Sequence, residues 1–527
     1  FDFRNPSASI PKLVQAYKLI QNLENDHWRE IKLVEIKEII AQSAGLYLEA
    51  VAASQMATPG EIINLEIEAI NRSNSDIELV SISHLGNKTL PQNSKLTNNK
   101  ELRIKDSITI SNDAEYTTPY WLASPGTLGM YKVKDSKLIG KPETPRQYRV
   151  TFNLMVNGTP IDFHRPIVYK TNDPVDGEIY KPFDIVPKAS SRILQDMVVF
   201  NSNEPKEITV AVKSGIDNLK GNVSLAYPSS WVVSPDKQAV DISSKGEEQL
   251  VTFTITPPSS QEEGIVSPIV EVGNKKFDRQ LVEIDYDHIP FQNVLLPNTS
   301  RIVKIDLKRA GENIGYIDGA GDVVPESLRN IGYNVVPLDY QNLTLEKLEE
   351  FDAVILGIRA YNVLDGIQFK QPLLFEYVKN GGNLIVQYNT SRGLNVDTLA
   401  PYSLELSRDR VTDEESEVKF LSPGHEVLNY PNKITQKDFD GWVQERGLYF
   451  PDKWSEEFTP ILSMNDVGET PKKGSLLVAK YGEGYYVYTG LSFFREFPAG
   501  VPGAYRLFAN LIALGKNQSS SSKIQGN

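Results

Sequence analysis

The chain has 527 residues, 40% hydrophobic and 23% charged, with a formal net charge of −13 and no cysteine. At about 150 residues per domain, this length predicts three or four domains. The acidic charge excludes an electrostatic nucleic-acid footprint, the absence of an apolar run near 18 residues excludes a membrane-spanning helix, and the lack of cysteine excludes disulfides and thiolate sites. A cysteine-free chain suits an oxidising compartment, so we expect a periplasmic or secreted bacterial protein.

Residues 1–53 are predicted to form a helical segment. Apolar residues recur at helical spacing in IPKLVQAYKLIQNL (10–23), and the pattern returns in HWREIKLVEIKEIIAQSAGLYLEAVA (27–52). A hairpin of this size is too small to be stable alone. We therefore expect it to pack on a neighbour.

Two β-sandwiches are predicted next, at 54–172 and 173–290. In the first, Ile63, Leu65, Ile67 and Ala69 alternate with polar residues, a pattern typical of half-buried strands. The same alternation recurs over 148–156, through Tyr148, Val150, Phe152, Leu154 and Val156. The second sandwich is expected to be Ig-like, to follow a linker, KTNDPVDGEIYKP (170–182), and to have Trp231 in its core.

Residues 291–516 alternate strand and helix patterns. Predicted strands are NIGYIDG, YNVVPLD, DAVILGI and NLIVQYN, separated by the helical runs DVVPESLRNIG, TLEKLEEF and FKQPLLFEYVKNGG. This alternation predicts an α/β domain with a mainly parallel sheet and helices on both faces. The polar segment 517–527 is predicted to be a flexible tail, and the start at Phe1 suggests a piece of a longer protein.

Five polar residues follow the predicted parallel strands of this domain. Ligands bind beyond the carboxyl ends of such strands, and the residues found there are Asp318, Arg359, Asn389, Arg392 and Arg495. One interpretation is a small-anion or sugar pocket with two or three guanidiniums as donors. The other is a rim of salt bridges that ties the loops together.

The sequence offers little for nucleophilic or metal chemistry. GNLIVQYNTSRG (382–393) runs from a buried strand into a loop with Asn389, Thr390 and Ser391 but no G-x-S-x-G pattern. His425 is the only histidine of the domain, so its pairing with Thr390 or Ser391 stays open as an alternative. The five histidines are scattered singly and fit no zinc motif, and Asp438 and Asp440 suit calcium only weakly.

Two aromatic-rich stretches complete the candidates. They are TPYWLASPGTLGMY in the first sandwich and DFDGWVQERGLYFPDKW in the α/β domain. Exposed tyrosine and tryptophan rings stack on sugars, whereas buried ones fill cores. A core or interface role is the favoured interpretation for both stretches.

The whole chain resembles the C-terminal region of large PIG-L/LmbE-type deacetylases of Bacteroidetes-type bacteria. The stretches that carry the resemblance include NPSASIPKLVQAYKLIQ, IGYIDGAGDVVPESLRNIGYNV, YPNKITQKDFDGWVQERGLYFPDKW and GYYVYTGLSFFREFPAGVPGAYRLFANLI. The resemblance implies zinc-dependent removal of N-acetyl groups from amino sugars, performed by an upstream domain with a His-Pro-Asp-Asp motif. This motif has no counterpart here, so no catalytic or metal-binding residue is transferred.

The resemblance also bears on individual domains. The second sandwich is similar to Ig-like accessory domains of bacterial glycosidases, and the α/β domain is similar to flavodoxin-like, class I glutaminase-like and ThuA-like domains. In a glutaminase-like domain the nucleophile would follow GGNLIVQYN, where this chain has Tyr388 or Asn389 instead of cysteine. Glutaminase activity is therefore not expected.

Together these points predict a non-catalytic accessory region that binds a glycan or amino-sugar derivative. Its expected partner is an upstream deacetylase domain that holds the zinc, and no cofactor is expected in this chain itself. Two alternatives remain open. One is a cryptic enzyme built on Asp318, Arg359, Asn389 and Arg392, and the other is a purely structural scaffold.

Overall fold

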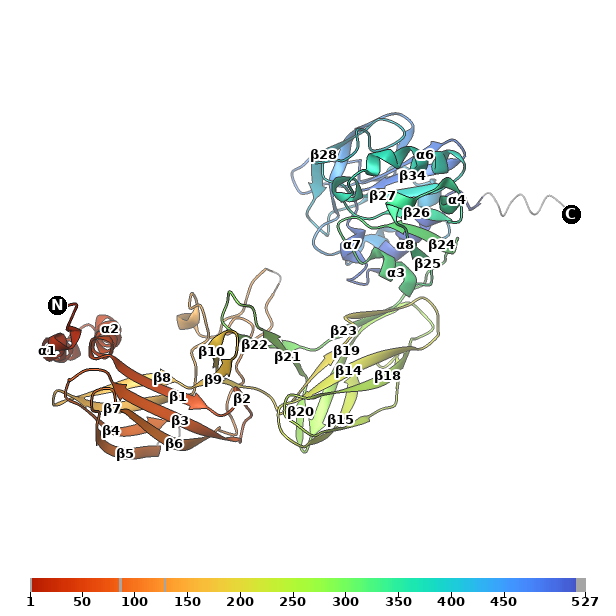
Figure 1. Ribbon diagram of the computed structural model, residues 1–527. Helices are drawn as coiled ribbons and strands as arrows, with labels where there is room; N and C mark the ends of the chain where they lie inside the picture. Colours follow the sequence, from red (N-terminus) through yellow and green to blue (C-terminus); the bar gives the residue numbers. More distant parts are fainter. Residues whose placement is uncertain (1, 85–87, 128, 518–527) are drawn as a thin grey trace.

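The computed structural model describes residues 2–84, 88–127 and 129–517. Figure 1 shows, in chain order, a helical hairpin, two all-β domains and a C-terminal domain in which helices flank a sheet. The predicted multidomain organisation with Ig-like β-sandwiches is confirmed by these sheets. Residues 518–527 of the predicted tail lie outside the described residues.

The N-terminal hairpin consists of α1 (Ile10–Gln21) and α2 (Asp26–Ala44), preceded by the 3-10 turn η1 (Pro6–Ser9). The predicted helical segment, 1–53, extends too far, because α2 ends at Ala44 and Leu46–Ala52 forms the strand β1. Gly45 adopts a left-handed φ of 59°, and its N–H bonds to the carbonyls of the last helical turn. This glycine cap stops the helix, and the alternating residues after it continue as a strand.

α2 has apolar residues on two faces. Ile36 and Ile40 are buried in one continuous core with the first sandwich, so the hairpin packs on a neighbour as predicted. On the other face Trp28, Val34 and Ile39 are 52%, 66% and 41% exposed. The apolar residues found at helical spacing in the sequence therefore lie on two faces of α2, one buried and one exposed to solvent.

Two antiparallel sheets pack to form the first sandwich. The sheet orders are β10-β9-β1-β3-β6 and β5-β4-β7-β8, with β1 and β9 as a parallel pair. The alternating residues predicted for two of its strands, β3 and β7, are buried, which confirms their patterning. The strands and turns are β2 (Met56–Ala57), β3 (Ile62–Asn71), β4 (Ile77–His84), β5 (Lys88–Lys95), β6 (Glu101–Thr109), η2 (Ser136–Leu138), β7 (Arg149–Val156), β8 (Thr159–Pro166), β9 (Val168–Asp173) and β10 (Gly177–Pro182).

The segment predicted as a linker, 170–182, belongs to this sandwich. It forms most of the antiparallel hairpin β9–β10 at the edge of the first sheet. Its Pro, Gly and Asp residues serve the turn of that hairpin, since Asp173 accepts hydrogen bonds from the backbone N–H groups of Val175 and Asp176. Pro, Gly and Asp are common both in tight turns and in linkers, so composition alone did not distinguish this turn from a linker.

The second sandwich has sheet orders β12-β14-β18-β16 and β13-β23-β19-β15-β17, with β20 beside β19. Trp231 is 2% exposed and packs edge-on against Phe200, with ring centroids 5.2 Å apart, which confirms its predicted core position. The sandwich extends to Lys304, beyond the predicted limit at residue 290. Two further pairs lie outside these sheets, β11 with β2 and β21 with β22. The strands from 184 onward are β11 (Asp184–Ile185), β12 (Ala189–Ile193), β13 (Met197–Phe200), β14 (Lys206–Ser214), β15 (Leu219–Ala226), β16 (Val232–Ser234), β17 (Gln238–Ile242), β18 (Glu248–Thr256), β19 (Glu262–Val272), β20 (Lys275–Phe277), β21 (Arg279–Ile284), β22 (Gln292–Pro297) and β23 (Ser300–Lys304).

The C-terminal sheet has the order β25-β24-β26-β27-β34-β33-β31. The first five strands are parallel to one another, whereas β33 pairs antiparallel with β34, and β31 pairs antiparallel with β33. Every strand predicted from the sequence in this domain is present. The bounds are β24 (Asn313–Ile317), β25 (Asn334–Pro337), β26 (Ala353–Leu356), β27 (Asn383–Gln387), β31 (Phe458–Pro460), β33 (Leu476–Tyr481) and β34 (Gly484–Thr489).

Helices cover both faces of this sheet, as predicted. One core contains residues of α3 and α8, and a separate core on the opposite face contains residues of α4 and α6. The helices and 3-10 turns are α3 (Val324–Asn330), η3 (Tyr340–Asn342), α4 (Leu345–Leu348), α5 (Ala360–Val363), η4 (Ile367–Phe369), α6 (Gln371–Lys379), η5 (Glu426–Leu428), η6 (Gln436–Phe439), α7 (Phe493–Glu496) and α8 (Pro502–Ile512).

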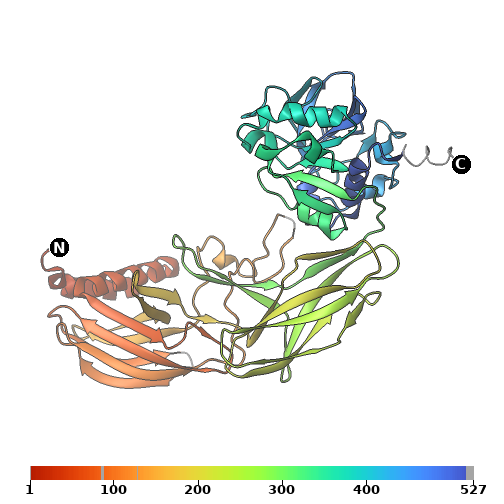
Figure 2. The same cartoon turned by 45° about the vertical axis from the view of Figure 1, so that its right-hand side comes forward.

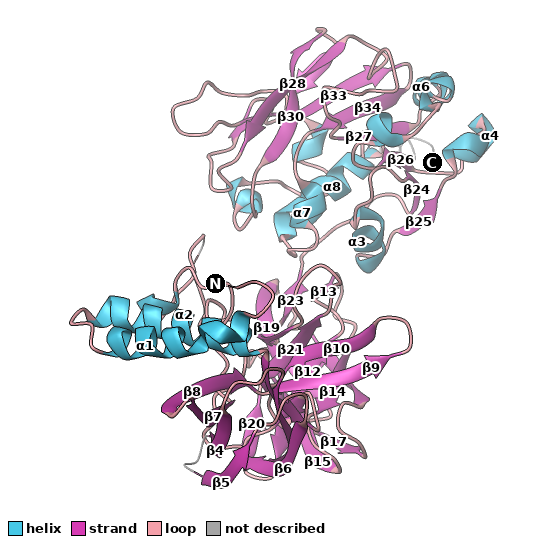
Figure 3. Cartoon of the chain, turned by 60° about the vertical axis from the view of Figure 1, so that its left-hand side comes forward, coloured by secondary structure: helices cyan, strands magenta, loops and turns pink. Residues whose placement is uncertain are grey.

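An insertion between β27 and β33 was not predicted as strands. It contains the antiparallel pair β28 (Leu404–Val411) and β30 (Gly447–Trp454), and the short pair β29 (Lys419–Phe420) and β32 (Leu462–Ser463). Figure 3 shows β28 and β30 next to the C-terminal domain's main sheet. A β-bridge from Gly447 to Leu491 joins β30 to the segment after β34, so the insertion reaches the carboxyl edge of the sheet.

Figure 2 shows the domains in a second view. Side-chain contacts connect them. Lys245 of the second sandwich pairs with Glu61 of the first at 2.9 Å. Lys206 donates to the carbonyl of Asn330 in the α/β domain at 3.1 Å, and Asn201 donates to the carbonyl of Ile331 at 2.6 Å. The second sandwich therefore holds both of its neighbours through hydrogen-bonded contacts.

The packing of α2 gives a testable prediction. Ile40→Ala removes a fully buried side chain from the shared core, so we expect the free energy of unfolding of the first sandwich to fall by about 2–5 kcal/mol. Val34→Ala is the control, because this residue is 66% exposed and should change stability by at most about 0.5 kcal/mol. Urea unfolding of the full chain measures both, and equal effects would contradict the packing.

Candidate functional site

The predicted polar residues do follow neighbouring parallel strands. β24, β26, β27 and β34 lie side by side in the same direction, so their carboxyl ends meet at one edge of the sheet. Asp318, Arg359, Asn389 and Arg495 come after these strands in that order. The structure nevertheless gives these residues different surroundings.

A cluster of arginine and aromatic side chains lies beyond β26, β27 and β34. We call Arg359, Tyr388, Tyr449, Phe494 and Arg495 the arginine–tyrosine cluster. The Tyr388 ring is nearly parallel to Tyr449, with centroids 6.3 Å apart and planes at 10°, and its centroid is 5.3 Å from that of Phe494. The Arg495 guanidinium lies 4.9 Å from the Phe494 ring centroid. This geometry is that of a cation–π contact beside a stacked aromatic pair.

Tyr388 is the centre of this cluster. Burial raises the pKa of its hydroxyl, while Arg359 and Arg495 act in the opposite direction because both guanidiniums are close enough to favour the phenolate. Its backbone carbonyl accepts a hydrogen bond from the Arg359 N–H at 2.8 Å. The hydroxyl therefore stays a proton donor at neutral pH, with two positive charges nearby.

Three residues around the cluster have left-handed backbone conformations although none is glycine. The φ angles are 57° at Arg359, 67° at Gln444 and 51° at Tyr449. Such residues cost roughly 1–3 kcal/mol each and concentrate at sites where a side chain must be held in a set position. The Tyr449 carbonyl is fixed by a 3.3 Å hydrogen bond from the buried Tyr488 hydroxyl.

The charges at the cluster are unevenly paired. Glu445 is 2% exposed and faces both Arg410 and Arg495, with 3.0 Å between its Oε1 and the Arg495 Nη2. Arg495 also hydrogen-bonds to Gln444. Arg359, in contrast, has no ion-pair partner within the described residues, and its buried Nε has no hydrogen-bond acceptor.

Asn389 does not face the cluster. It is fully buried, and its amide oxygen accepts from the Tyr361 N–H at 2.9 Å while its amide nitrogen donates to the Gln387 carbonyl at 3.0 Å. Its backbone N–H donates to the Tyr488 hydroxyl at 3.2 Å. The sequence interpretation of Asn389 as a ligand contact is corrected here, because its side chain has no exposed surface and both polar groups are already bonded.

Arg392 and Asp318 are exposed and lie outside the cluster. Arg392 takes part in the loop through its carbonyl, which accepts from Thr390 at 2.9 Å and from Asn362 at 3.1 Å. Asp318 lines a pocket of about 290 Å³ with Asp322 and Arg329 among its other residues. Ligand binding by these two residues stays a prediction.

Asp322 belongs to a buried network that the sequence did not reveal. It accepts from the Tyr316 hydroxyl at 2.7 Å and from the backbone N–H groups of Val324 and Ile358, and Gln387 donates to the Tyr316 oxygen at 3.0 Å. Burial raises the pKa of Asp322, and the nearby carboxylate of Asp318 adds to this shift. The network fixes the loop after β24 to the ends of β26 and β27.

The alternative nucleophile arrangement is not assembled in the structure. Thr390 donates its hydroxyl to the Arg392 carbonyl, and His425 caps the turn η5 by accepting from the Val427 N–H at 3.2 Å. Within the described residues no hydrogen bond joins His425 to Thr390 or Ser391. Thr390 and His425 therefore each stabilise a separate turn.

The weak calcium candidate Asp438 and the neighbouring Trp442 have structural roles. Asp438 accepts from the Thr435 hydroxyl and from Arg506 Nε at 2.6 Å, and Trp442, 3% exposed, donates to its carbonyl at 2.9 Å.

Across the described ranges, no group of three or more His, Asp or Glu residues is placed to hold a metal ion. In the same ranges, no helix has the length and apolar character needed to span a bilayer.

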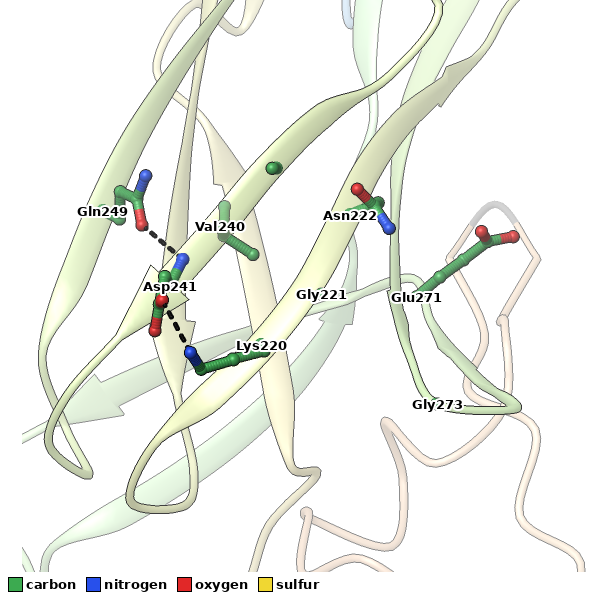
Figure 4. A pocket seen from close by; sticks show the side chains of 9 residues that line it. Lys220, Gly221, Asn222, Val240, Asp241, Gln249, Glu271 and Gly273 are labelled. Carbon is green, nitrogen blue, oxygen red and sulfur yellow. Dashed lines mark hydrogen bonds and ion pairs between the residues drawn. The ribbon is translucent and has the colours of Figure 1, made fainter.

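Another hollow lies on the second sandwich, at the edge formed by β15 and β17. This groove of about 610 Å³ is drawn in Figure 4. Its charged groups are paired within the protein, since Lys220 lies 3.1 Å from Asp241, and Glu271 pairs with Lys237 and Lys276. No aromatic residue is among those that line it, so it lacks the features of the arginine–tyrosine cluster.

No family model matches the chain, and no curated protein matches it. Solved structures align with parts of it. A CARDB domain from Pyrococcus furiosus, solved with two metal ions, is 19% identical, covers 22% of this chain and 91% of its own, and has a TM-score of 0.15. Native α2-macroglobulin of Escherichia coli is 12% identical, with coverage of 49% and 16% and a TM-score of 0.17. Red sea bream transglutaminase is 11% identical, with coverage of 50% and 33% and a TM-score of 0.19.

The chain therefore spans only 16% of the macroglobulin and 33% of the transglutaminase. Likenesses with TM-scores this low carry no functional argument.

The buried position of Asn389 gives a prediction. Asn389→Ala leaves the Tyr361 N–H without an acceptor, so we expect the free energy of unfolding of the α/β domain to fall by about 1–3 kcal/mol. Arg392→Ala, in the same loop but exposed, is the control and should stay within about 0.5 kcal/mol of wild type. Chemical unfolding measures both, and a neutral Asn389→Ala variant would refute the structural role.

Glu496 gives a second prediction. It is fully buried, and burial raises its pKa to about 8 although the Val443 N–H, Ser492 and two arginines favour the charged form. Folding therefore raises this pKa above its ordinary value of 4.5. The stabilisation from binding this proton is complete below the ordinary value and is lost as pH rises through about 8.

The variant Glu496→Gln tests this dependence because glutamine does not titrate. Relative to wild type, we expect its thermal midpoint to rise steadily between about pH 5 and about pH 9. Glu456→Gln, at an exposed glutamate, should show no such trend. Parallel pH profiles for wild type and Glu496→Gln would be inconsistent with a protonated carboxyl at neutral pH.

Proposed function

We propose that this chain is a non-catalytic, glycan-binding accessory region of a PIG-L/LmbE-type, zinc-dependent N-acetyl-sugar deacetylase that works outside the cytoplasm. In this proposal the two sandwiches act as spacers and the C-terminal domain binds the sugar. Zinc belongs to an upstream deacetylase domain rather than to this chain.

The arginine–tyrosine cluster is the observation that carries the proposal. It occupies the end of β27, where a glutaminase-like domain would present its nucleophile, and the residues there are Tyr388 and the buried Asn389. Aromatic faces and charge-assisted donors are the groups with which proteins hold sugars, since rings stack on the sugar and guanidiniums bind its oxygens. The site is therefore equipped to bind and to orient a sugar.

The strand order supports a finer description of the domain as flavodoxin-like or class I glutaminase-like. Numbered along the chain, its parallel strands follow the order 2-1-3-4-5, from β25 to β34. In sheets of this order, ligands bind beyond the carboxyl ends of the strands. The arginine–tyrosine cluster lies at that edge.

The experiment is a glycan-binding screen of the full chain, followed by titration of the best ligand. Tyr449→Ala removes one stacking ring, and we expect roughly tenfold weaker binding. Tyr131→Ala is the control, because this tyrosine is 67% exposed in the first sandwich, and binding should not change. Loss of binding in the control instead would move the site to the first sandwich.

Acetate release from N-acetylated sugars is measured with the same samples. We expect none above the blank, because no residue of the cluster is an activated nucleophile or a metal ligand. Acetate release by the chain alone would contradict the non-catalytic role and favour the cryptic enzyme. A screen without any bound glycan would favour the structural scaffold.

A further inference from the structure

We infer that the ligand of the arginine–tyrosine cluster is an acidic sugar, whose carboxylate pairs with the guanidinium of Arg359 while its ring lies against Tyr449. This inference rests on the proposed glycan-binding function and specifies the substrate class. Three features of the site support it: an unused cation, an excess of positive charge and a stacked aromatic surface.

The unused cation is Arg359. Its buried Nε has no acceptor, whereas the more deeply buried Arg446 donates from three nitrogens to the carbonyls of Ser416 and Phe439. The protein thus supplies acceptors to the buried guanidinium of Arg446, and none to that of the partly buried Arg359. A carboxylate bound to the guanidinium of Arg359 would supply charge-assisted acceptors that the protein does not.

The excess charge follows from the acidic neighbours. Glu445 is already shared by Arg410 and Arg495, and the fully buried Glu496 keeps its proton at neutral pH because burial raises its pKa to about 8. Within the described residues, no acidic side chain forms an ion pair with Arg359. One unpaired guanidinium matches one negative charge, as a sugar carboxylate provides.

The aromatic surface distinguishes a sugar from a simple anion. Tyr388 is 8% exposed and is held by Phe494, whereas Tyr449 is half-buried and presents a ring nearly parallel to it. Tyr449 and Arg359 share a left-handed backbone conformation. An inorganic anion would contact the guanidinium alone and leave the rings unused.

Calorimetric titration of the full chain with matched sugars tests the inference. N-acetylmuramic acid and N-acetylglucosamine differ by a lactyl carboxylate, and D-glucuronate and D-glucose differ by a carboxylate at one carbon. In each pair we expect the acid to bind about tenfold tighter or more, and this preference should shrink at high salt.

Three variants localise the effect. Arg359→Gln should weaken binding of each acid about 10- to 100-fold, to the level of the neutral sugar, and Arg359→Lys should give an intermediate loss because it keeps the charge but not the fork. Arg392→Gln is the matched control at the exposed arginine of the same edge and should bind as wild type does. Thermal unfolding verifies that all three variants are folded.

Each outcome decides between the proposals. Equal binding of acid and neutral sugars overturns the carboxylate inference and leaves glycan binding intact, whereas no binding of any sugar overturns both. An acid preference that survives in folded Arg359→Gln places the carboxylate elsewhere and overturns the assignment to Arg359. Equally tight binding of acetate or inorganic phosphate would reveal an unspecific anion site and would also overturn it.

Discussion

The hydrogen bonds of Asn389 hold together the end of the sheet on which the candidate site is built. Its amide connects the start of α5, through the Tyr361 N–H, to the Gln387 carbonyl at the end of β27, and its backbone N–H reaches Tyr488 of β34. These are three different segments, and their bonds lie in a fully buried place where unpaired groups are costly. This shared residue fixes the position of its neighbour Tyr388.

The site combines a rigid, hydrogen-bonded framework with positive charge that the protein neutralises only in part. Tyr488 passes the connection on to the Tyr449 carbonyl, and the Arg359 N–H bonds to Tyr388, so both rings and the free guanidinium are attached to the same buried framework. Glu445 neutralises part of the positive charge through its ion pairs with Arg410 and Arg495. A preorganised site of this kind spends little conformational entropy on binding a ligand.

Sequence patterns predicted the parallel strands, and with them the shared edge that receives Arg359 and Arg495, because strand ends follow from local apolar runs and turn residues. They did not reveal that Asn389 is buried, since its partners Tyr361 and Tyr488 lie far along the chain. Tyr449 lies in an aromatic stretch that the sequence singled out, but its place beside Tyr388 was not predicted, because it comes from the β28–β30 insertion, whose pairing is irregular and long-range. The end of α2 at Gly45 was overlooked because apolar spacing alone does not separate the last helical turn from a following strand.

The central claim is that the edge beyond β26 and β27 binds a sugar through Arg359 and the tyrosine pair. The most direct measurement is a crystal structure of the chain grown with N-acetylmuramic acid. The account predicts the carboxylate in the fork of Arg359, with the sugar ring against Tyr449. A sugar bound in the β15–β17 groove, or an Arg359 paired with a protein carboxylate while the cluster holds no ligand, would contradict it.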